Sequence, residues 1–223
     1  MRKCFTIFFA SLAIKGYTQT ALQTLEFDGT ADKPLVIMVS GDGGLKGFTV
    51  SLARAIHDKG YAVTLIDARS YFWQKKTPEE TTAAISACVA KKLSPGNDRR
   101  WVMVGYSFGA DITPFVINRL PDSLKSRLTT GPVLLSPSTS TDFEIHLSDM
   151  FGIGGKRSMD VISEINRMGE MNVSVLAGDD EQDFPVEKIK LPHFHHELIR
   201  GGHHYDGDYR MVAERVCGVI EGT

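Results

Sequence analysis

The sequence predicts a single α/β domain in which a mostly parallel sheet carries helices on both faces. The chain has 223 residues, enough for one domain of this class with a full core. Short apolar runs alternate along it with longer stretches of helical periodicity, the order that gives a parallel sheet. The runs Leu35–Val39 and Trp101–Val104 are apolar almost throughout, which is typical of strands buried on both faces.

The composition is that of a soluble globular protein. Hydrophobic residues make up 42% of the chain and charged residues 23%. The net charge is −2 and no run is rich in Lys and Arg, so nucleic acid is not expected as a partner. After the first twenty residues only Cys88 and Cys217 remain, and two cysteines do not make a disulfide framework.

The first twenty residues have the pattern of a secretory signal peptide. Arg2 and Lys3 precede an apolar run over Cys4–Ile14. This run is shorter than the roughly 20 residues that span a bilayer, and it suits the core of a signal peptide. We therefore expect residues 1–20 to be removed and residues 21–223 to form a periplasmic or secreted domain. A buried N-terminal strand or helix is the alternative.

Each element in the first half of the domain has its own local signal. The strands are short apolar runs, and the first helix has one apolar face and ends at Gly60. Before the second helix, Thr77 is an N-cap, Pro78 stands at the first helical position and Glu80 completes a capping box. The predicted elements are strands at 22–27, 35–39 and 61–66 and helices at 48–59 and 78–93.

The second half continues the alternation and contains one long irregular stretch. Residues 137–157 show no clear periodicity and are rich in Ser, Asp and Gly, so this insertion is a candidate lid. Its larger apolar residues are Phe143, Ile145, Leu147, Met150 and Phe151. The predicted elements are strands at 101–104, 131–136, 172–177 and 193–199 and helices at 110–120, 160–168 and 209–220.

The motif Gly105-Tyr106-Ser107-Phe108-Gly109 lies between a predicted strand and a predicted helix. A sharp turn in that context is typical of the nucleophile elbow of α/β-hydrolases, which holds a serine hydroxyl clear of the sheet. Gly105 and Gly109 fit because the positions on either side of the turn have no room for side chains. An ordinary glycine turn with an idle serine is the alternative.

A glycine-rich loop, Ser40–Gly44, follows the apolar run that ends at Val39. In hydrolases of this architecture one oxyanion donor comes from this loop and one from the residue after the nucleophile. The expected donors are the N–H of Asp42 or Gly43 and that of Phe108. A phosphate-binding loop is the competing interpretation, but neither the G-x-G-x-x-G spacing nor a Walker lysine-serine pair is present.

The acid of a triad should come from the loop after the strand that ends at Ala177, because the hydrolase order is Ser, then Asp or Glu, then His. We favour Asp183, which lies far enough along the loop to turn back toward the serine and is followed by Pro185. Glu181 is the second choice. The remaining candidates are Asp179 and Asp180.

The base is expected to be His203 or His204, which follow Gly201-Gly202 after the last strand. His203 fits the G-H-x-aromatic pattern better, with Tyr205 as the aromatic residue. A serine hydroxyl is a weak nucleophile unless such a base takes its proton and a third group orients the base.

A metal site is the rival chemistry. Five of the seven histidines fall between His193 and His204, and His193 and His195 would share one face of a strand. Zinc needs three or four converging ligands, and neither H-E-x-x-H nor a second ligand pair is present. We therefore expect no metal and no cofactor.

Two further features bear on substrate. Tyr71, Phe72 and Trp73 form an aromatic cluster that either walls a substrate pocket or packs in the core. Acidic residues outnumber basic ones among the segments expected above Ser107, which favours a cationic acyl group. The acids are Asp42, Glu144, Asp206 and Asp208, and the bases are Lys46 and Arg69.

The two cysteines are expected to be separated by the sheet. In the hydrolase fold the first and last helices cover one face and the helices between them cover the other. Cys88 and Cys217 would then lie far beyond the ~7 Å Cα separation that a disulfide allows, and we predict two buried free thiols.

Four motifs together resemble the bacterial virulence protein VirJ/AcvB family. They are G-D-G-G, Y-F-W with T-P-E, the elbow block G-Y-S-F-G-A-D-I, and G-G-H-H-Y-D-G-D-Y, within residues 35–209. The resemblance implies a periplasmic α/β-hydrolase fold, hydrolysis of aminoacylated (notably lysyl) phosphatidylglycerol at the membrane surface, and a link to type IV secretion proteins. It also places Ser107, Asp183 and the two histidines at the family's triad positions.

Two positions depart from the family pattern. Leu45 stands where a tryptophan often follows G-D-G-G, and Ser70 stands where an arginine usually precedes Y-F-W. A non-catalytic binding or secretion-accessory module and a general carboxylesterase are the alternative functions, since a fold does not fix a function.

Overall fold

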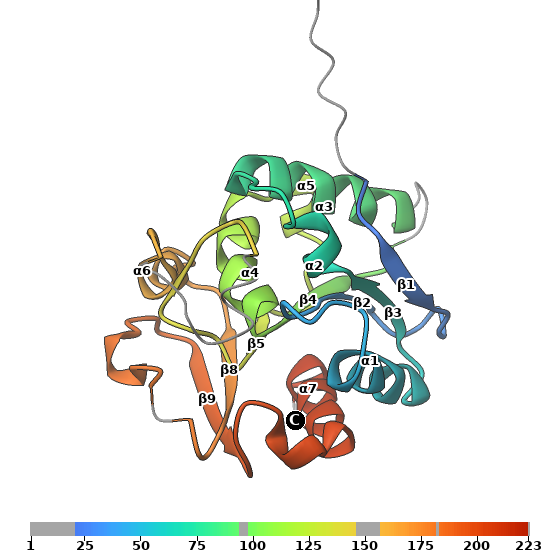
Figure 1. The fold of residues 1–223 in the computed structure, drawn as a ribbon. Helices are drawn as coiled ribbons and strands as arrows, with labels where there is room; N and C mark the ends of the chain where they lie inside the picture. Colours follow the sequence, from blue (N-terminus) through green and yellow to red (C-terminus); the bar gives the residue numbers. More distant parts are fainter. Residues whose placement is uncertain (1–20, 94–97, 146–156, 182, 223) are drawn as a thin grey trace, which may run out of the picture.

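The computed structural model describes residues 21–93, 98–145, 157–181 and 183–222, and Figure 1 shows their arrangement. Seven strands form one sheet in the order β1-β3-β2-β4-β5-β8-β9. Every neighbouring pair is parallel except β1 with β3, so an antiparallel strand lies at one edge. The strands are β1 (Thr24–Phe27), β2 (Leu35–Val39), β3 (Ala62–Ile66), β4 (Trp101–Tyr106), β5 (Val133–Leu135), β8 (Val173–Gly178) and β9 (Phe194–Ile199).

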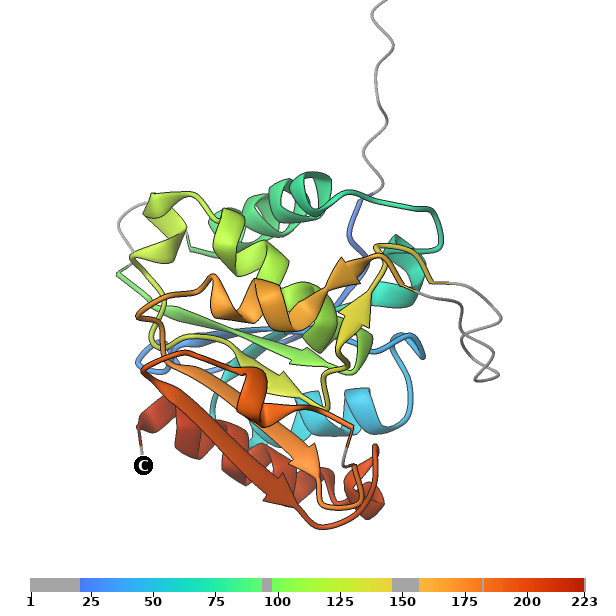
Figure 2. The same cartoon turned by 90° about the vertical axis from the view of Figure 1, so that its left-hand side faces the viewer.

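Helices cover both faces of this sheet, as the sequence predicts. In Figures 1 and 2 the first and last helices lie together on one side, and the others lie on the opposite side. The first group is α1 (Phe48–Asp58) and α7 (Tyr209–Glu221). The second group is α3 (Pro78–Lys92), α4 (Phe108–Arg119), α5 (Asp122–Lys125) and α6 (Val161–Asn166). The short remaining elements are α2 (Ala68–Tyr71), β6 (Ser140–Thr141), β7 (Met159–Asp160), η2 (Val186–Lys188) and η3 (Tyr205–Gly207).

The register of the central strands brings their carboxyl ends to one edge. Val39 of β2 pairs with Gly105 of β4, and Tyr106 pairs with Leu135 of β5. Leu135 in turn pairs with Leu176 of β8. The loops that follow these strands therefore meet above the same edge, where ligands bind in sheets of this kind.

The capping box that begins α3 forms as predicted. The Thr77 hydroxyl accepts a hydrogen bond of 3.1 Å from the Glu80 N–H. The Glu80 carboxylate accepts one of 2.8 Å from the Thr77 N–H. These two bonds satisfy backbone donors that the first turn of a helix otherwise leaves unpaired.

The structure corrects two expectations about the middle of the chain. The strand predicted at 131–136 covers only Val133–Leu135, and at its carboxyl end Ser136 has a positive φ of 47° and leaves the extended conformation. Phe143 and Ile145, which the sequence places in a lid, are buried in the core instead. The Phe143 ring packs edge-on against Phe72 with a centroid distance of 5.9 Å. Residues 146–156 of the expected lid, among them Leu147, Met150 and Phe151, lie outside the described residues.

The expected signal peptide at residues 1–20 also lies outside the described residues. Among the residues that the structure does describe, no helix has the length and apolar character needed to cross a membrane.

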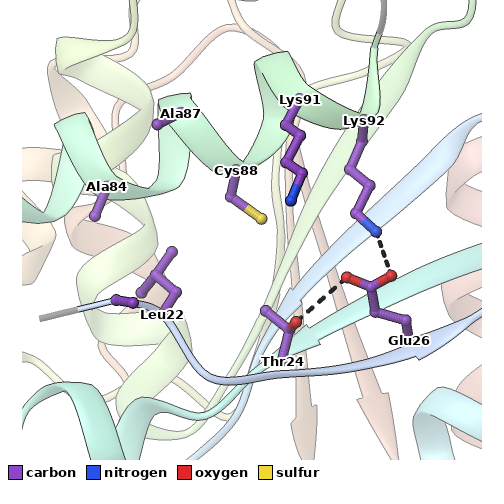
Figure 3. Close-up of a pocket in the computed structure, with 9 residues that line it drawn as sticks. Leu22, Thr24, Glu26, Ala84, Ala87, Cys88, Lys91 and Lys92 are labelled. Carbon is purple, nitrogen blue, oxygen red and sulfur yellow. Dashed lines mark hydrogen bonds and ion pairs between the residues drawn. The ribbon is translucent and has the colours of Figure 1, made fainter.

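The two cysteines lie on opposite faces of the sheet and are both free thiols. Cys217 on α7 is buried among residues that pack with α1. Cys88 on α3 is only half-buried, which corrects the expectation that both are buried. It lines a cavity of about 370 Å³ between α3 and β1 together with Leu22 and Lys91, and Figure 3 shows these side chains around it. Burial raises the pKa of both thiols, that of Cys217 to about 11.

We expect two free thiols in protein that begins at Ala21, even in an oxidising compartment. Alkylation under native conditions should modify Cys88 before Cys217, because Cys217 is the more deeply buried. Alkylation after denaturation without reductant should modify both, and intact-mass measurement counts the adducts. A chain that takes up no adduct and lacks two hydrogens would contain a disulfide and contradict the placement of α3 and α7.

Candidate active site

Ser107 occupies a strained turn between β4 and α4. Its φ of 53° and ψ of −122° lie outside the regions that residues with side chains prefer. The Ser107 N–H donates to the Leu135 carbonyl at 2.8 Å, and its own carbonyl accepts from the Ala110 N–H at 2.7 Å. The turn is therefore fixed on both sides, with the hydroxyl at the carboxyl edge of the sheet.

The two elbow glycines are required by close backbone approaches. A Cβ atom on Gly105 would lie 2.4 Å from the Gly109 carbonyl oxygen, as expected from the tight turn. A Cβ atom on Gly109 would lie 2.3 Å from the Val39 carbonyl oxygen at the end of β2. The first glycine lets α4 cross β4, and the second lets α4 pack against the neighbouring strand.

His203 bridges the serine and a carboxylate. Its Nε2 atom lies 2.8 Å from Ser107 Oγ, and its Nδ1 atom lies 2.5 Å from Glu181 Oε1. The second histidine of the motif points elsewhere, because His204 Nδ1 lies 2.5 Å from the Tyr106 hydroxyl. Of the two histidines, His203 is therefore the one in contact with Ser107.

The carboxylate on His203 belongs to Glu181 and not to Asp183, which corrects the sequence-based choice. Asp183 is exposed and lies on the rim of a cavity beside the serine. Glu181 follows β8 in a tight turn, in which its N–H donates to the Gly178 carbonyl at 2.9 Å. This turn folds the Glu181 side chain back over the end of the strand, so no longer loop is needed to reach the histidine.

The far oxygen of the Glu181 carboxylate is also held. Oε2 accepts a hydrogen bond of 2.5 Å from the Ser136 hydroxyl and one of 3.0 Å from the Gly178 N–H. Burial opposes ionisation of this carboxyl, but the hydrogen bonds from His203, Ser136 and Gly178 outweigh burial and lower its pKa to about 2. Glu181 is therefore ionised at neutral pH.

The charge of Glu181 acts on His203 in turn. Their hydrogen bond raises the pKa of the His203 imidazole above its ordinary value, against the opposing effect of burial. An imidazole with a raised pKa is a stronger base toward the serine proton.

The glycine-rich loop after β2 lies beside the serine. A Cβ atom on Gly41 would lie 3.3 Å from Ser107 Cβ. The Gly44 N–H closes a turn onto the Gly41 carbonyl at 3.0 Å, so this bond does not use the N–H groups of Asp42 and Gly43. Phe108 begins α4, where the first N–H groups have no carbonyl partner within the helix. These N–H groups are the expected oxyanion donors, and they occupy the two sides of the elbow.

Two cavities meet at Ser107 and His203, and both residues line each of them. The larger, about 600 Å³, lies between the Gly41–Gly43 loop and the start of α7 and includes Phe48 and Tyr209. The smaller, about 340 Å³, lies over the loops that follow β5 and β8.

A model of the bacterial virulence protein VirJ matches residues 33–222. The chain belongs to the VirJ family. No curated protein gives a significant match to the chain.

Solved structures share the fold of this VirJ family member at low sequence identity. Est1E from Butyrivibrio proteoclasticus is 17% identical, with a TM-score of 0.63 over 90% of this chain and 93% of that one. Proline iminopeptidase of Mycobacterium smegmatis is 12% identical, with a TM-score of 0.63 over 92% and 96%. MenH from S. aureus is 13% identical, with a TM-score of 0.61 over 89% and 98%. At these identities the likeness establishes the α/β-hydrolase fold.

Two residues of the expected aromatic cluster, Tyr71 and Phe72, pack in the core, and none of the cluster's three residues lines either cavity at Ser107. Tyr71 and Phe72 are 2% and 1% exposed. The Phe72 ring lies edge-on to Phe108 with a centroid distance of 5.0 Å. Phe72 therefore supports the residue that follows the nucleophile, and Trp73 is exposed.

The histidines of β9 have separate partners. His195 lies 3.6 Å from Glu197, and the His196 ring stacks on Phe194. His193, just before the strand, lies 3.8 Å from Glu170. In the described part of the chain no three His, Cys, Asp or Glu residues converge as metal ligands do.

Sequence reasoning missed two groups around Ser107, His203 and Glu181. Ser136 carried no motif, and only its place at the end of a predicted strand pointed to the carboxyl edge. Asp111, in the first turn of α4, is 1% exposed and accepts hydrogen bonds from the Ser138 N–H at 2.6 Å and hydroxyl at 2.5 Å. Burial raises the pKa of this carboxyl to about 7 despite those bonds. Asp111 thus ties the loop after β5 to the nucleophile helix.

Proposed function

We propose that this protein is a serine hydrolase that cleaves a carboxylic ester through an acyl-enzyme. The observation that carries the proposal is the continuous contact from Ser107 Oγ through the His203 ring to Glu181. Nucleophile, base and orienting carboxylate stand in the order and geometry that acyl transfer requires.

The reaction follows from these positions. His203 Nε2 takes the Ser107 proton as Oγ attacks the ester carbonyl, and Glu181 stabilises the resulting imidazolium. The N–H groups of Phe108 and of Asp42 or Gly43 hold the oxyanion. His203 then donates its proton to the leaving alcohol. In the second half, water attacks the acyl-enzyme by the same route and releases the acid.

We further propose that the acyl group is cationic, as in a lysyl ester of a lipid alcohol. The smaller cavity supports this, because its lining includes Asp180 and Asp183 besides Glu181, and no Lys or Arg stands among the described residues that line it. The larger cavity, with Phe48, Tyr106 and Tyr209, suits the alcohol half of the ester. The membership in the VirJ family points to the same class of substrate.

Three of the acids that the sequence placed above Ser107 lie outside both cavities. Asp206 lies 3.8 Å from Arg200, and Asp208 caps α7 through the Met211 N–H at 3.0 Å. Neither Asp206 nor Asp208 lines a cavity at Ser107, and neither does Glu144. The proposed electrostatic selection therefore rests on the acids after β8.

The proposal includes a location. A periplasmic protein acting at the membrane surface, in contact with secretion-system proteins, agrees with the predicted signal peptide and with the family resemblance. Fractionation of cells that express the full chain, with detection of the processed N-terminus, tests the location separately from the activity.

The substrate is tested by comparing lysyl-phosphatidylglycerol, alanyl-phosphatidylglycerol and a neutral short-chain ester. We expect the lysyl lipid to have the highest kcat/KM, with a preference that shrinks as salt rises, because exposed charges are screened over ~8–10 Å. Asp180→Asn with Asp183→Asn should lower kcat/KM for the lysyl lipid by about fivefold, the order of one exposed ion pair, and leave the neutral ester unchanged.

Asp206→Asn, which removes an acid outside both cavities, is the matched control and should change neither substrate. Equal rates on all three substrates at every salt concentration would contradict the cationic selection and indicate a general carboxylesterase. Absence of turnover on all three, with no labelling by a serine-directed probe, would favour a non-catalytic binding or secretion-accessory module.

A further inference from the structure

A buried hydrogen-bonded group lies on the side of Glu181 that faces away from His203. Ser136 is 4% exposed and Tyr205 is fully buried. The Ser136 Oγ atom lies 2.5 Å from Glu181 Oε2 and 2.8 Å from the Tyr205 hydroxyl. The three groups come from the loops after β5, β8 and β9, so they join the segments that carry the acid and the base.

The available protons give these contacts a direction. Ser136 has one hydroxyl proton, and the ionised carboxylate at 2.5 Å is a stronger acceptor than the phenol oxygen at 2.8 Å. Ser136 therefore donates to Glu181. Burial raises the pKa of the Tyr205 phenol, which remains protonated and donates to the Leu176 carbonyl at 2.8 Å, while its oxygen stays 2.8 Å from Ser136 Oγ.

The backbone of Ser136 is strained in a way that serves this contact. Its φ of 47° lies in the left-handed region, which serine adopts only at a cost. Its N–H still donates to the Leu176 carbonyl at 2.8 Å, so the residue leaves the strand without losing its link to β8. Glycine would adopt this φ without strain but has no hydroxyl. The strained serine therefore places at this position a hydroxyl that glycine could not supply.

We propose that Ser136, supported by Tyr205, is a positioning residue that fixes the Glu181 carboxylate so that Oε1 faces His203. This inference rests on the proposed function, because it assigns a role within that triad. Held at Oε2 by Ser136 and the Gly178 N–H, the carboxylate cannot rotate away from the imidazole. Loss of the Ser136 bond leaves one of these two restraints.

The test is Ser136→Gly, which removes the hydroxyl and suits the left-handed backbone. We expect the variant to stay folded with a melting temperature close to that of wild type, since relief of the strained φ offsets the lost hydrogen bond and the added freedom of the unfolded chain. We expect kcat on the neutral ester to fall by about tenfold with KM unchanged, the order of one hydrogen bond to a charged group. The pKa of His203, followed by NMR of its ring, should fall, because a carboxylate free to rotate stabilises the imidazolium less.

Asp206→Gly is the matched control. Asp206 is another non-glycine residue with a positive φ, of 50°, and it makes no hydrogen bond or ion pair with Ser107, His203 or Glu181 among those that the structure shows. It should leave kcat and the His203 pKa unchanged. Tyr205→Phe should lower kcat by about twofold only, and adding it to Ser136→Gly should cost nothing further if Tyr205 acts through Ser136.

An unchanged kcat and an unchanged His203 pKa in Ser136→Gly would overturn the inference. A rise in that pKa would also overturn it, because Ser136 would then compete with His203 for the carboxylate instead of orienting it. The NMR titration needs no turnover, so it decides the inference even if wild-type protein proves inactive. Wild type and Ser107→Ala in the same assay show separately whether the proposed function holds.

Discussion

Replacing Ser107 by alanine is expected to abolish ester turnover and labelling by a fluorophosphonate probe. Loss of a triad nucleophile typically costs on the order of 10⁴–10⁶ in turnover, because no other group forms the acyl-enzyme. The fold should persist, since alanine keeps the strained turn whose backbone bonds to Leu135 and Ala110 do not involve the hydroxyl. Probe labelling, ester hydrolysis and circular dichroism of the two proteins provide the measurement.

Ser123→Ala, in the short helix α5, is the control and should behave as wild type. Wild-type protein that never labels or turns over any ester would contradict the proposed function. Activity that EDTA abolishes and Ser107→Ala retains would replace it with metal chemistry.

Glu181→Gln is expected to lower kcat on a neutral ester by on the order of 10³–10⁴, while Asp183→Asn changes it by less than about twofold. The large effect follows because the amide no longer stabilises the imidazolium and offers the wrong hydrogen-bonding groups to Nδ1. Asp183 makes no contact with His203, so its neutralisation leaves the triad intact. Each variant removes one negative charge from the same loop. A difference in kcat between them therefore isolates the role of the carboxylate that contacts His203.

The pH profile gives an independent check on Glu181. In wild type the carboxylate raises the pKa of His203, which must be neutral to accept the serine proton. Activity should therefore fall as the pH drops through this raised pKa. In Glu181→Gln the pKa of His203 should return toward its ordinary value, and the acid limb of kcat/KM should move to lower pH at a reduced maximum. An acid limb at the same pH in both proteins would mean that another group raises the His203 pKa.

The same carboxyl also links stability to pH. The pKa of Glu181 is lowered from 4.5 to about 2 on folding, so its ionised form favours the native state above the unfolded pKa. This contribution is lost as the pH falls through the folded-state pKa. The difference in unfolding free energy between wild type and Glu181→Gln should therefore shrink between about pH 4.5 and 2.

The sequence by itself determined the fold class and the place of the chemistry. The apolar runs, the capping box at Thr77 and the alternation of strands with helices are local patterns, and the parallel sheet follows from them. Gly105 has a local cause as well, because a Cβ atom there would meet the Gly109 carbonyl within the same sharp turn, whereas Gly109 is required by the carbonyl of Val39 at the end of β2. The common edge of the loops follows from the parallel direction of the strands.

Only the tertiary structure decided which side chains meet at that edge. Glu181 and Asp183 are two residues apart in one acidic loop, and the tight turn at Gly178 decides between them. His203 and His204 are adjacent in sequence, and the bond of His204 to Tyr106 separates their roles. Sequence spacing carries no information on where a loop turns back, because that depends on contacts with strands distant in the chain. Ser136 shows this most plainly: its contact with Glu181 joins residues 45 positions apart, and no local pattern marks it.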